Sequence, residues 1–383
     1  MKVISFNIRS GDDPNGHSID ERAPRLKKII DKYDPDIIGF QEVVPRWYPY
    51  VMEDYGEKYE ILHKYRNLKT DIEGCSILWK KGQFELLDYG WFWYSDTPAC
   101  SSIGPWSREH HYRFCLWAEL KECATEKTFH FFDTHFGGGE ENQMKSAEIL
   151  RTYAERMQVE KMILVGDFNL RETSKTYPLL TDFLVDLNME TAKDKRITGH
   201  DYNPDREGLP IDFCFVSPKT IEPTSYYRID DTVDGKFPSD HCGLLLELNV
   251  RAQLRVATVD LASDGLDDGA REALARKARN HIQRFEADLA IVHHCNPIMK
   301  EKMEHLDRFS QEGELFWDRS RYALVEKLPH GAVLKDLMME EELTVLTDEE
   351  TLIYKGEPLA PYFIEKKELN PAKQEGTFAK YVF

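Results

Sequence analysis

The sequence lacks the features that mark secreted, membrane and zinc-finger proteins. Its seven cysteines include no CxxC pair and form an odd total, which argues against a disulfide framework and against a thiolate zinc site. No apolar run approaches the roughly 20 residues of a membrane span. The opening residues, MKVISFNIRS, contain no signal-peptide core. A reduced protein without a membrane span, located in the cytoplasm, is therefore expected.

Positive charge is also scarce. The chain has 50 lysines and arginines against 68 acidic residues, a formal net charge of −18, which repels a polyanion unless a basic patch or bound cations intervene. Long nucleic acid is thus disfavoured as a partner. The GxSxG and Walker signatures of serine hydrolases and P-loop proteins are missing as well.

Apolar runs of strand length are frequent up to residue 250, and many of them end in a polar residue. The run KMILV, for example, is followed by Gly166, Asp167 and Asn169. An Asp and an Asn after a strand can be ordinary turn formers, but loops that leave buried strands also carry the chemistry of many α/β proteins. Eight polar residues lie at or near such strand ends: Asn7, Glu42, His135, Asp167, Asn169, Asp212, Asp240 and His241.

Eight such placements are unlikely to arise by chance, so we expect these residues to gather on one rim of the protein. They supply oxygen ligands without a thiolate set, which suits Mg²⁺ or Mn²⁺. Between the strands, ERAPRLKKIIDKY and QMKSAEILRTYAERM have the apolar spacing of helices. Both hairpin and crossover connections are implied, so the sheets should be mixed.

The motifs SFN, QE, TH, GDFN, ID[FY] and SDH, in this order, resemble those of the endonuclease/exonuclease/phosphatase superfamily over about residues 1–250. The stretch EGCSILWKKGQFELLDYGWFWYSDTP, followed by HHYRFCLWAEL, is similar to the bacterial metal-dependent hydrolase branch with a CCR4-like catalytic domain. The resemblance implies an α/β fold like that of deoxyribonucleases, a four-layer sandwich of two packed mixed β-sheets flanked by helices. In THFGGGEENQ, the Asp-His usual after the Phe is replaced, so the substrate contacts of this loop should differ.

The resemblance also implies a metal site and a water-activating group. Glu42 resembles the principal metal-ligating carboxylate, with Asn7 adjacent and Asp240 contributing to the metal cluster or to a second metal position. The metal would be Mg²⁺ or Mn²⁺. Asp167 would orient or deprotonate the attacking water, and Asn169 would hold the phosphate.

Two histidines are expected to stabilise the transition state by donating to phosphate oxygens. The resemblance implies that His241 is oriented by Asp212 and that His135 is oriented by Glu73. A carboxylate behind an imidazole fixes its tautomer and favours its charged form.

Two further residues are candidates for substrate binding. Arg113 lies near the start of YRFCLWAELK, where a surface strand cation is the alternative interpretation. His200 lies in ITGHDYNP, where relatives also place a polar group near the substrate.

These roles predict a metal-dependent phosphoesterase that hydrolyses a small or medium phosphate mono- or diester by in-line attack of water. A nuclease or deadenylase acting on nucleic acid is the alternative within the same class. The alternative outside the enzymes is a non-catalytic binding protein with the same fold. Residues 1–250 keep every catalytic residue type, which favours the enzyme.

Beyond residue 250 the chain resembles its own beginning. LRVATVDLASDGLDDGAREALARKARNHIQRFEADLAIVHH follows MKVISFNIRSGDDPNGHSIDERAPRLKKIIDKYDPDIIGFQE in strand, acidic loop, helix and second strand. Asn7 and Glu42 are 35 residues apart, and Asp260 and His294 are 34 apart. Residues 251–383 are therefore predicted to form a smaller α+β domain, a degenerate and truncated half-repeat of residues 1–250.

This second domain is expected to be non-catalytic, because no second GDFN, TH or SDH occurs after residue 250. The alternative is a metal site at Asp260, His293, His294 and Cys295. Its strands are expected to be too few for two packed sheets, which would leave an apolar face to bury. That face would be covered by the catalytic domain or by a second subunit in a homodimer.

Overall fold

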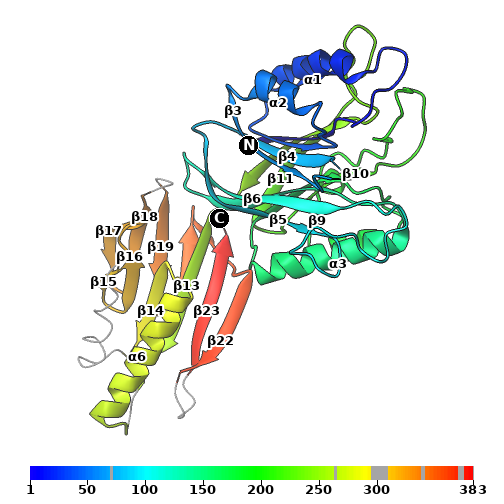
Figure 1. Cartoon of the computed structure of the whole chain (residues 1–383). Helices are drawn as coiled ribbons and strands as arrows, with labels where there is room; N and C mark the ends of the chain where they lie inside the picture. Colours follow the sequence, from blue (N-terminus) through cyan, green and yellow to red (C-terminus); the bar gives the residue numbers. More distant parts are fainter. Residues whose placement is uncertain (70–71, 263–264, 295–308, 338–340, 370–374, 383) are drawn as a thin grey trace. The chain divides into compact units, whose positions relative to one another are not determined.

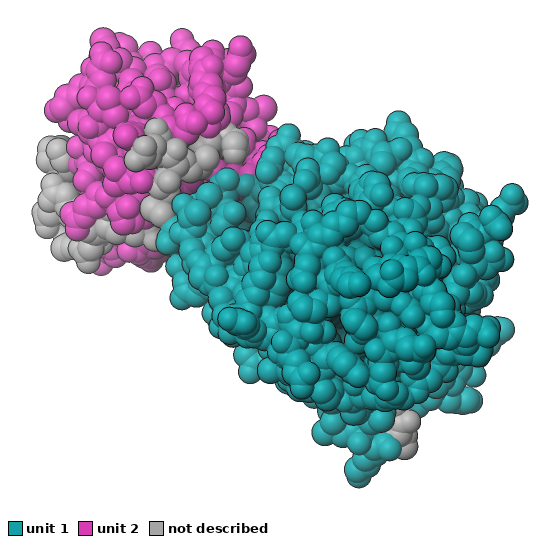
Figure 2. All heavy atoms as spheres, turned by 90° about the horizontal axis from the view of Figure 1, so that it is seen from above, with its two compact units in different colours: residues 1–250 teal, residues 251–383 magenta. Residues whose placement is uncertain are grey.

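The computed structural model describes residues 1–69, 72–262, 265–294, 309–337, 341–369 and 375–382. The chain divides into two compact units, which we call unit 1 (Met1–Val250) and unit 2 (Arg251–Phe383) (Figure 2). No helix within the described ranges is both long enough and apolar enough to cross a membrane.

The first sheet of unit 1 joins strands from the two ends of the unit. Its six strands among the described residues are β1 (Lys2–Asn7), β2 (Ile37–Gln41), β3 (Tyr59–Tyr65), β4 (Gly74–Lys80), β11 (Ile221–Ile229) and β12 (Gly243–Val250). They lie in the order β11-β12-β1-β2-β4-β3. Strand β1 pairs in parallel with β2, with Asn7 opposite Gln41. Asn7 and the end of β2 therefore lie at the same edge of the sheet.

The second sheet of unit 1 brings three of the predicted site residues into neighbouring positions. Its six strands in the described chain are β5 (Phe84–Trp93), β6 (Phe114–Glu122), β7 (Thr128–His135), β8 (Met162–Asp167), β9 (Val185–Asp186) and β10 (Asp212–Val216). They lie in the order β5-β6-β7-β8-β10-β9. Asp167 at the end of β8 is opposite His135 on β7 and Asp212 on β10.

Helices cover the outer face of each sheet (Figure 1). On the first sheet, α1 (Ile19–Tyr33) and α2 (Tyr48–Tyr55) pack against side chains such as Phe6 and Phe40. On the second, α3 (Glu140–Arg156) and α4 (Thr176–Thr181) pack against side chains such as Phe132. A short helix, α5 (Leu187–Glu190), follows β9. The predicted mixed sheets with flanking helices are thus confirmed for this unit.

The two sheets of unit 1 face each other across a core whose composition changes toward one end. Side chains from both sheets, such as Val3, Ile37 and Phe131, form one apolar cluster. Because successive residues of a strand alternate between faces, the next inward positions are Ser5, Gly39 and Asp133. The following ones are Asn7, Gln41, His135 and Asp167. Hydrophobic packing thus gives way to polar residues at the edge where β1, β2, β7 and β8 end.

Unit 2 also contains two sheets within the described ranges. The larger has strands β13 (Gln253–Asp260), β14 (Leu289–His293), β15 (Phe309–Glu312), β16 (Leu315–Asp318), β22 (Phe363–Glu368) and β23 (Glu375–Val382). The smaller has β17 (Tyr322–Leu328), β18 (Gly331–Asp336), β19 (Glu342–Leu346), β20 (Thr351–Tyr354) and β21 (Glu357–Pro358). Helix α6 (Asp268–Arg284) packs on the larger sheet.

The expectation that this unit has too few strands for two packed sheets is wrong. One apolar cluster contains Val256 and Leu289 from the larger sheet and Leu334 and Val345 from the smaller, so the two sheets bury their apolar faces against each other. The runs ELTVLT and TLIYKG are strand-like in the sequence, but they are short and carry no polar motif, so their pairing into a second sheet was not predicted.

The larger sheet of unit 2 repeats the first sheet of unit 1 more completely than the sequence indicated. Its order, β22-β23-β13-β14-β16-β15, matches β11-β12-β1-β2-β4-β3 position by position. In both sheets the central pair is parallel and the closing strand is antiparallel to the opening one. The copy therefore includes counterparts of the closing strands, which a half-repeat would lack. In the smaller sheet, four residues join the antiparallel strands β19 and β20, whereas α3 lies between the parallel strands β7 and β8.

Candidate active site

Asn7 connects the two sheets at the polar edge of unit 1. Its side chain is fully buried, and its Nδ2 donates to Glu42 Oε1 and to Asp167 Oδ2, both at 3.0 Å. Its Oδ1 accepts from the backbone N–H of Arg9 at 3.0 Å. Asn7 therefore holds one carboxylate from each sheet in a fixed relation.

Glu42 directly follows β2 in a left-handed backbone conformation, with φ of 63°. Its Oε2 accepts from the backbone N–H of Ser10 at 2.7 Å and from the Ser10 hydroxyl at 2.8 Å. Burial raises the pKa of Glu42, but these donors and Asn7 outweigh it and lower the pKa to about 2. Glu42 is therefore a stable carboxylate at any physiological pH.

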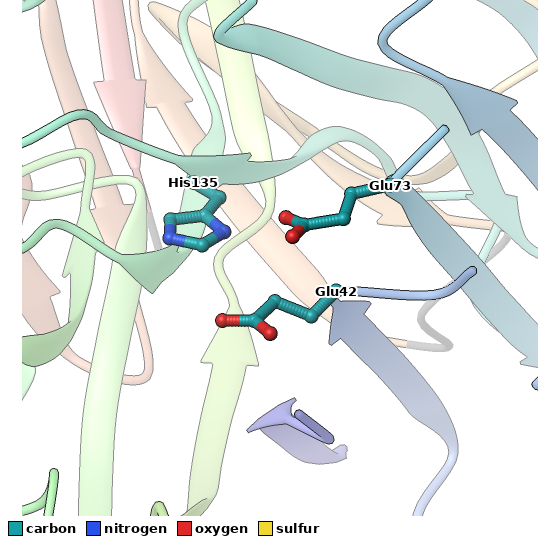
Figure 3. Close-up of side chains that lie close together, drawn as sticks. All are labelled: Glu42, Glu73 and His135. Carbon is teal, nitrogen blue, oxygen red and sulfur yellow. The ribbon is translucent and has the colours of Figure 1, made fainter. Parts of the chain in front are cut away.

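Glu73 precedes β4 and lies beside Glu42. The carboxylates of both residues and the ring of His135 point into one space (Figure 3), with one ligand atom of each within 4.8 Å of the others. The Ser10 hydroxyl also approaches Glu73 Oε1, at 3.0 Å. Because the Ser10 hydroxyl has one proton to donate, it can form a hydrogen bond with only one of the two carboxylates. A cation in this space would stabilise the contact that lacks a proton.

Asp167 lies at the centre of the site and is almost completely buried. Its Oδ1 accepts from the backbone N–H of Asn169 at 2.8 Å, and its Oδ2 lies 3.4 Å from His135 Nε2 and 3.9 Å from His241 Nε2. Burial, together with the charge of Asp212, raises the pKa of Asp167 to about 7. Asp167 can therefore exchange a proton near neutral pH, as a general base requires.

His241 and Asp212 form the imidazole–carboxylate pair that the sequence predicted. His241 Nδ1 lies 2.9 Å from Asp212 Oδ2. Burial alone lowers the pKa of His241, but the charge and hydrogen bond of Asp212, with the charge of Asp167, raise it well above the ordinary value. The ring is therefore a cation at neutral pH with its Nε2 proton directed toward Asp167. Asp167, Asp212 and His241 form a second group with ligand atoms within 4.8 Å.

His135 differs from the expectation, because Arg66 stands between it and Glu73. Arg66 Nη2 donates to His135 Nδ1 at 2.8 Å and pairs with Glu73 Oε2 at 2.7 Å. Burial, with the charges of Arg113 and Arg66, lowers the pKa of His135 well below the ordinary value. The ring is therefore neutral, with its proton on Nε2.

Asn169 is fixed beside His135. Its φ of 51° places it in the left-handed region, and its Nδ2 donates to the backbone carbonyl of Phe136 at 3.0 Å and lies 3.1 Å from His135 Nε2. The backbone carbonyl of Asn169 accepts from Gln143 Nε2 at 2.6 Å. Helix α3, through Gln143, thus supports the loop that follows β8.

Asp240 lies apart from both groups of ligand atoms. Its carboxylate is 3.6 Å from Arg9 Nε, and Arg9 also pairs with Asp13 at 3.0 Å. Burial raises the pKa of Asp240, and the charge of nearby Glu42 adds to this effect. Asp240 is thus close enough to Glu42 for one cation to interact with both carboxylates, although in the structure Arg9 lies against Asp240.

Arg113 and His200, the two predicted substrate contacts, both have buried polar atoms. The Arg113 side chain is 11% exposed and pairs through Nη2 with Glu109 at 3.2 Å, which rules out a surface strand cation. Its Nε and Nη1 have no hydrogen-bond partner among the described residues. Both ring nitrogens of His200 are buried, and burial lowers the pKa of this ring to about 4. Such donors and acceptors are satisfied when a polar ligand binds.

Sequence reasoning missed Ser10, Arg66 and Arg9. Each lies one to three residues beyond the end of a strand, outside the recognised motifs. A search for polar residues shortly after strand ends would have identified all three. Which carboxylate each one contacts is decided by tertiary packing.

Unit 2 places polar residues at the corresponding edge. Asp260 is opposite His293 as Asn7 is opposite Gln41, and His294 has φ of 55°, close to that of Glu42. His294 Nδ1 lies 2.7 Å from Asp260 Oδ1, and His293 Nδ1 lies 2.9 Å from Glu314 Oε2. Among the described residues, both groups of ligand atoms that fit a metal ion belong to unit 1. Cys295 lies outside the described residues.

Comparison with known proteins gives a consistent result. Residues 4–241 match the profile of the Endonuclease/Exonuclease/phosphatase family. A family protein from Bacteroides thetaiotaomicron is 26% identical, with a TM-score of 0.60 over 65% of this chain and 97% of that chain. A mannosyl-6-phosphatase from the same organism is 25% identical, with a TM-score of 0.59 over 65% and 99%. A family protein from Bacteroides vulgatus is 27% identical, with a TM-score of 0.59 over 65% and 98%. The search of curated proteins finds no match.

Proposed function

The chain belongs to the endonuclease/exonuclease/phosphatase family, and from this premise we propose that it is a metal-dependent phosphoesterase. It hydrolyses a small or medium phosphate mono- or diester by in-line attack of water. The observation that carries the proposal is the opposite protonation behaviour of two carboxylates in one buried cluster. The pKa of Glu42 is lowered to about 2, so this residue stays ionised, as a metal ligand requires. The pKa of Asp167 is raised to about 7, so this residue can act as a general base.

Glu42 and Glu73 are the residues that would hold the metal. Their oxygens suit Mg²⁺ or Mn²⁺. The Ser10 hydroxyl lies between them and has only one proton, so it can donate to only one of the two carboxylates. Asn7 orients Glu42, and Asp240 adds negative charge nearby. A bound ion would polarise a phosphoryl oxygen and neutralise its charge.

Asp167 accepts the proton of the attacking water. Its Oδ2 is held by Asn7 and its Oδ1 by the Asn169 backbone, so the carboxylate is oriented before substrate binds. Proton acceptance is favourable because burial has already raised its pKa.

His241 and His135 donate their Nε2 protons to phosphate oxygens in different charge states. His241 carries a positive charge supported by Asp212, so it stabilises the extra negative charge of the transition state most strongly. His135 donates as a neutral ring fixed by Arg66. Asn169 and Arg113 supply further donors to the phosphate.

The substrate class is proposed to include sugar phosphates, because the similar protein from Bacteroides thetaiotaomicron is a mannosyl-6-phosphatase. The test is a hydrolysis assay on mannose 6-phosphate, other phosphomonoesters, phosphodiesters, nucleotides and oligonucleotides with Mg²⁺ or Mn²⁺. EDTA is expected to abolish turnover, and added Mg²⁺ or Mn²⁺ to restore it. Full turnover in metal-free protein would overturn the mechanism, and cleavage of oligonucleotides alone would indicate a nuclease. Hydrolysis of no substrate would indicate a binding protein.

A further inference from the structure

Two buried polar side chains meet across the sheet-to-sheet core beneath the site. Gln41 on β2 and Asp133 on β7 are both completely buried, and Gln41 Nε2 donates to Asp133 Oδ1 at 2.7 Å. Gln41 belongs to the first sheet of unit 1 and Asp133 to the second. This hydrogen bond therefore ties the two sheets together inside the core.

The chain leaves space for this contact at Gly39. A Cβ at this position would lie 2.8 Å from Val165 Cγ2 and 3.2 Å from Asp133 Cγ, so a side chain here would push the second sheet away. Gln41 Nε2 also lies 3.2 Å from the carbonyl of Gly39 and 3.2 Å from Ser5 Oγ. Gln41 is thus held by its own sheet while it contacts the other.

The site itself is divided between the two sheets. Glu42, which would hold the metal, directly follows Gln41 in the chain. His135 lies two residues beyond Asp133, and Asp167 is opposite His135. A sliding of one sheet over the other would therefore change the distance between the metal-holding carboxylates and the water-activating one.

Apolar packing alone does not fix that distance, and the hydrogen bonds of Asn7 to Glu42 and Asp167 bridge the sheets only at the site itself. The core around Gln41 and Asp133 consists of side chains such as Val3, Ile77 and Val165, and apolar burial is non-directional. Buried polar pairs can instead specify one arrangement of two packed elements, even where apolar residues would be as stable.

We propose that the Gln41–Asp133 hydrogen bond is a positioning contact that sets the register of the two sheets and thereby aligns the metal-holding and water-activating halves of the site. The inference rests on the proposed function for its catalytic consequence. A contact that served stability alone would be replaceable by apolar side chains without loss of activity.

The experiment compares Gln41→Leu, Asp133→Leu and the double variant with the wild type. Each single variant removes one side of this buried contact and should lower Tm, whereas the double variant removes both groups and should recover Tm. Three quantities are measured: Tm, kcat on the best phosphoester, and the affinity of metal-free protein for Mn²⁺ by calorimetry. We expect the double variant to recover Tm while kcat stays at least about tenfold reduced and Mn²⁺ affinity at least severalfold reduced.

Two controls separate positioning from stability. Asp133→Asn keeps an acceptor for Gln41 and should preserve kcat and Mn²⁺ affinity. Tyr177→Phe removes a partly buried hydrogen bond to Asp186 at 2.7 Å, so it should lower Tm without lowering kcat. If the double variant is insoluble, Gln41→Met is compared with Tyr177→Phe, and only Gln41→Met should lose kcat and Mn²⁺ affinity.

The outcomes distinguish this inference from the proposed function. A double variant with wild-type Tm, kcat and Mn²⁺ affinity would overturn the positioning role, as would wild-type kcat and affinity in Gln41→Met. If the wild type hydrolyses no phosphoester, the proposed function fails, and the Mn²⁺ titrations still decide whether the contact aligns the two halves.

Discussion

Replacing Asp167 by asparagine is expected to remove most of the activity while leaving the protein as stable as the wild type or more so. The amide keeps one oxygen, which can accept from the Asn169 backbone N–H, whereas the oxygen that accepts from Asn7 Nδ2 is replaced by a donor group and loses that contact. The amide cannot accept a proton from water. The loss of a positioned general base lowers kcat by about 10²- to 10⁴-fold.

The stability effect follows from the raised pKa of this carboxyl group. In the unfolded chain its pKa has the ordinary value of 3.8, and in the folded protein it is about 7. Below pH 3.8 both states are protonated and no stability is lost. As the pH rises to about 7 the unfolded state releases its proton first, so folding stability falls. The difference corresponds to on the order of 4 kcal/mol without bound metal.

The assay measures thermal unfolding of both proteins in EDTA at several pH values, together with initial rates in Mg²⁺. The Tm of Asp167→Asn relative to wild type should increase between pH 4 and pH 7, whereas kcat should fall. Asp186→Asn is the matched control, because burial also raises the pKa of Asp186 but this residue lies outside the site. Unchanged kcat in folded Asp167→Asn would remove this residue from its role, and a Tm difference independent of pH would refute the electrostatic reasoning.

Three further variants test other parts of the site and the role of unit 2. Asp212→Asn should lower the pKa of His241, so that the alkaline limb of the kcat/KM profile moves to lower pH; a limb that stays in place would contradict the pairing. Arg113→Met should raise KM about tenfold, or about 1.4 kcal/mol of binding, without lowering Tm, because two buried guanidinium nitrogens find no partner in the described part of the chain; an unchanged KM would exclude substrate contact. Asp260→Ala combined with His294→Ala should leave kcat within about twofold of wild type, and loss of turnover in that folded variant would show that unit 2 takes part in catalysis.

The sequence was informative where polar residues interrupt an apolar alternation. Asn7, His135 and Asp167 occupy inward positions of their strands, where an apolar residue would otherwise extend the core. Their type and position could therefore be predicted without coordinates. Helices α1 and α3 were predicted from their apolar spacing, since each carries an apolar face that packs on a sheet, whereas the shorter α2, α4 and α5 were not predicted.

The contacts of the site were less predictable, because they depend on which loops meet after the sheets pack. Glu73 was expected behind His135, but the Arg66 guanidinium occupies that position and pairs with both. The charge state of His135 changes as a result. The two sequence neighbourhoods are 69 residues apart, and nothing in either one indicates that an arginine lies between them.

The position of β12 has a consequence for the order in which the protein can fold. Strand β1 pairs on one side with β2 and on the other with β12, where Lys2 is opposite Glu247. During synthesis at about 5–20 residues per second, β1 waits on the order of 10–50 s for this second neighbour. Asp240 and His241 also emerge only then, so unit 1 can complete neither its first sheet nor its active site before almost all of its chain has been made. Strand β13 likewise waits for its neighbour β23, which is made at the end of the chain. The nascent chain therefore exposes an unpaired strand edge twice, first at β1 and then at β13, and other chains could bind these edges.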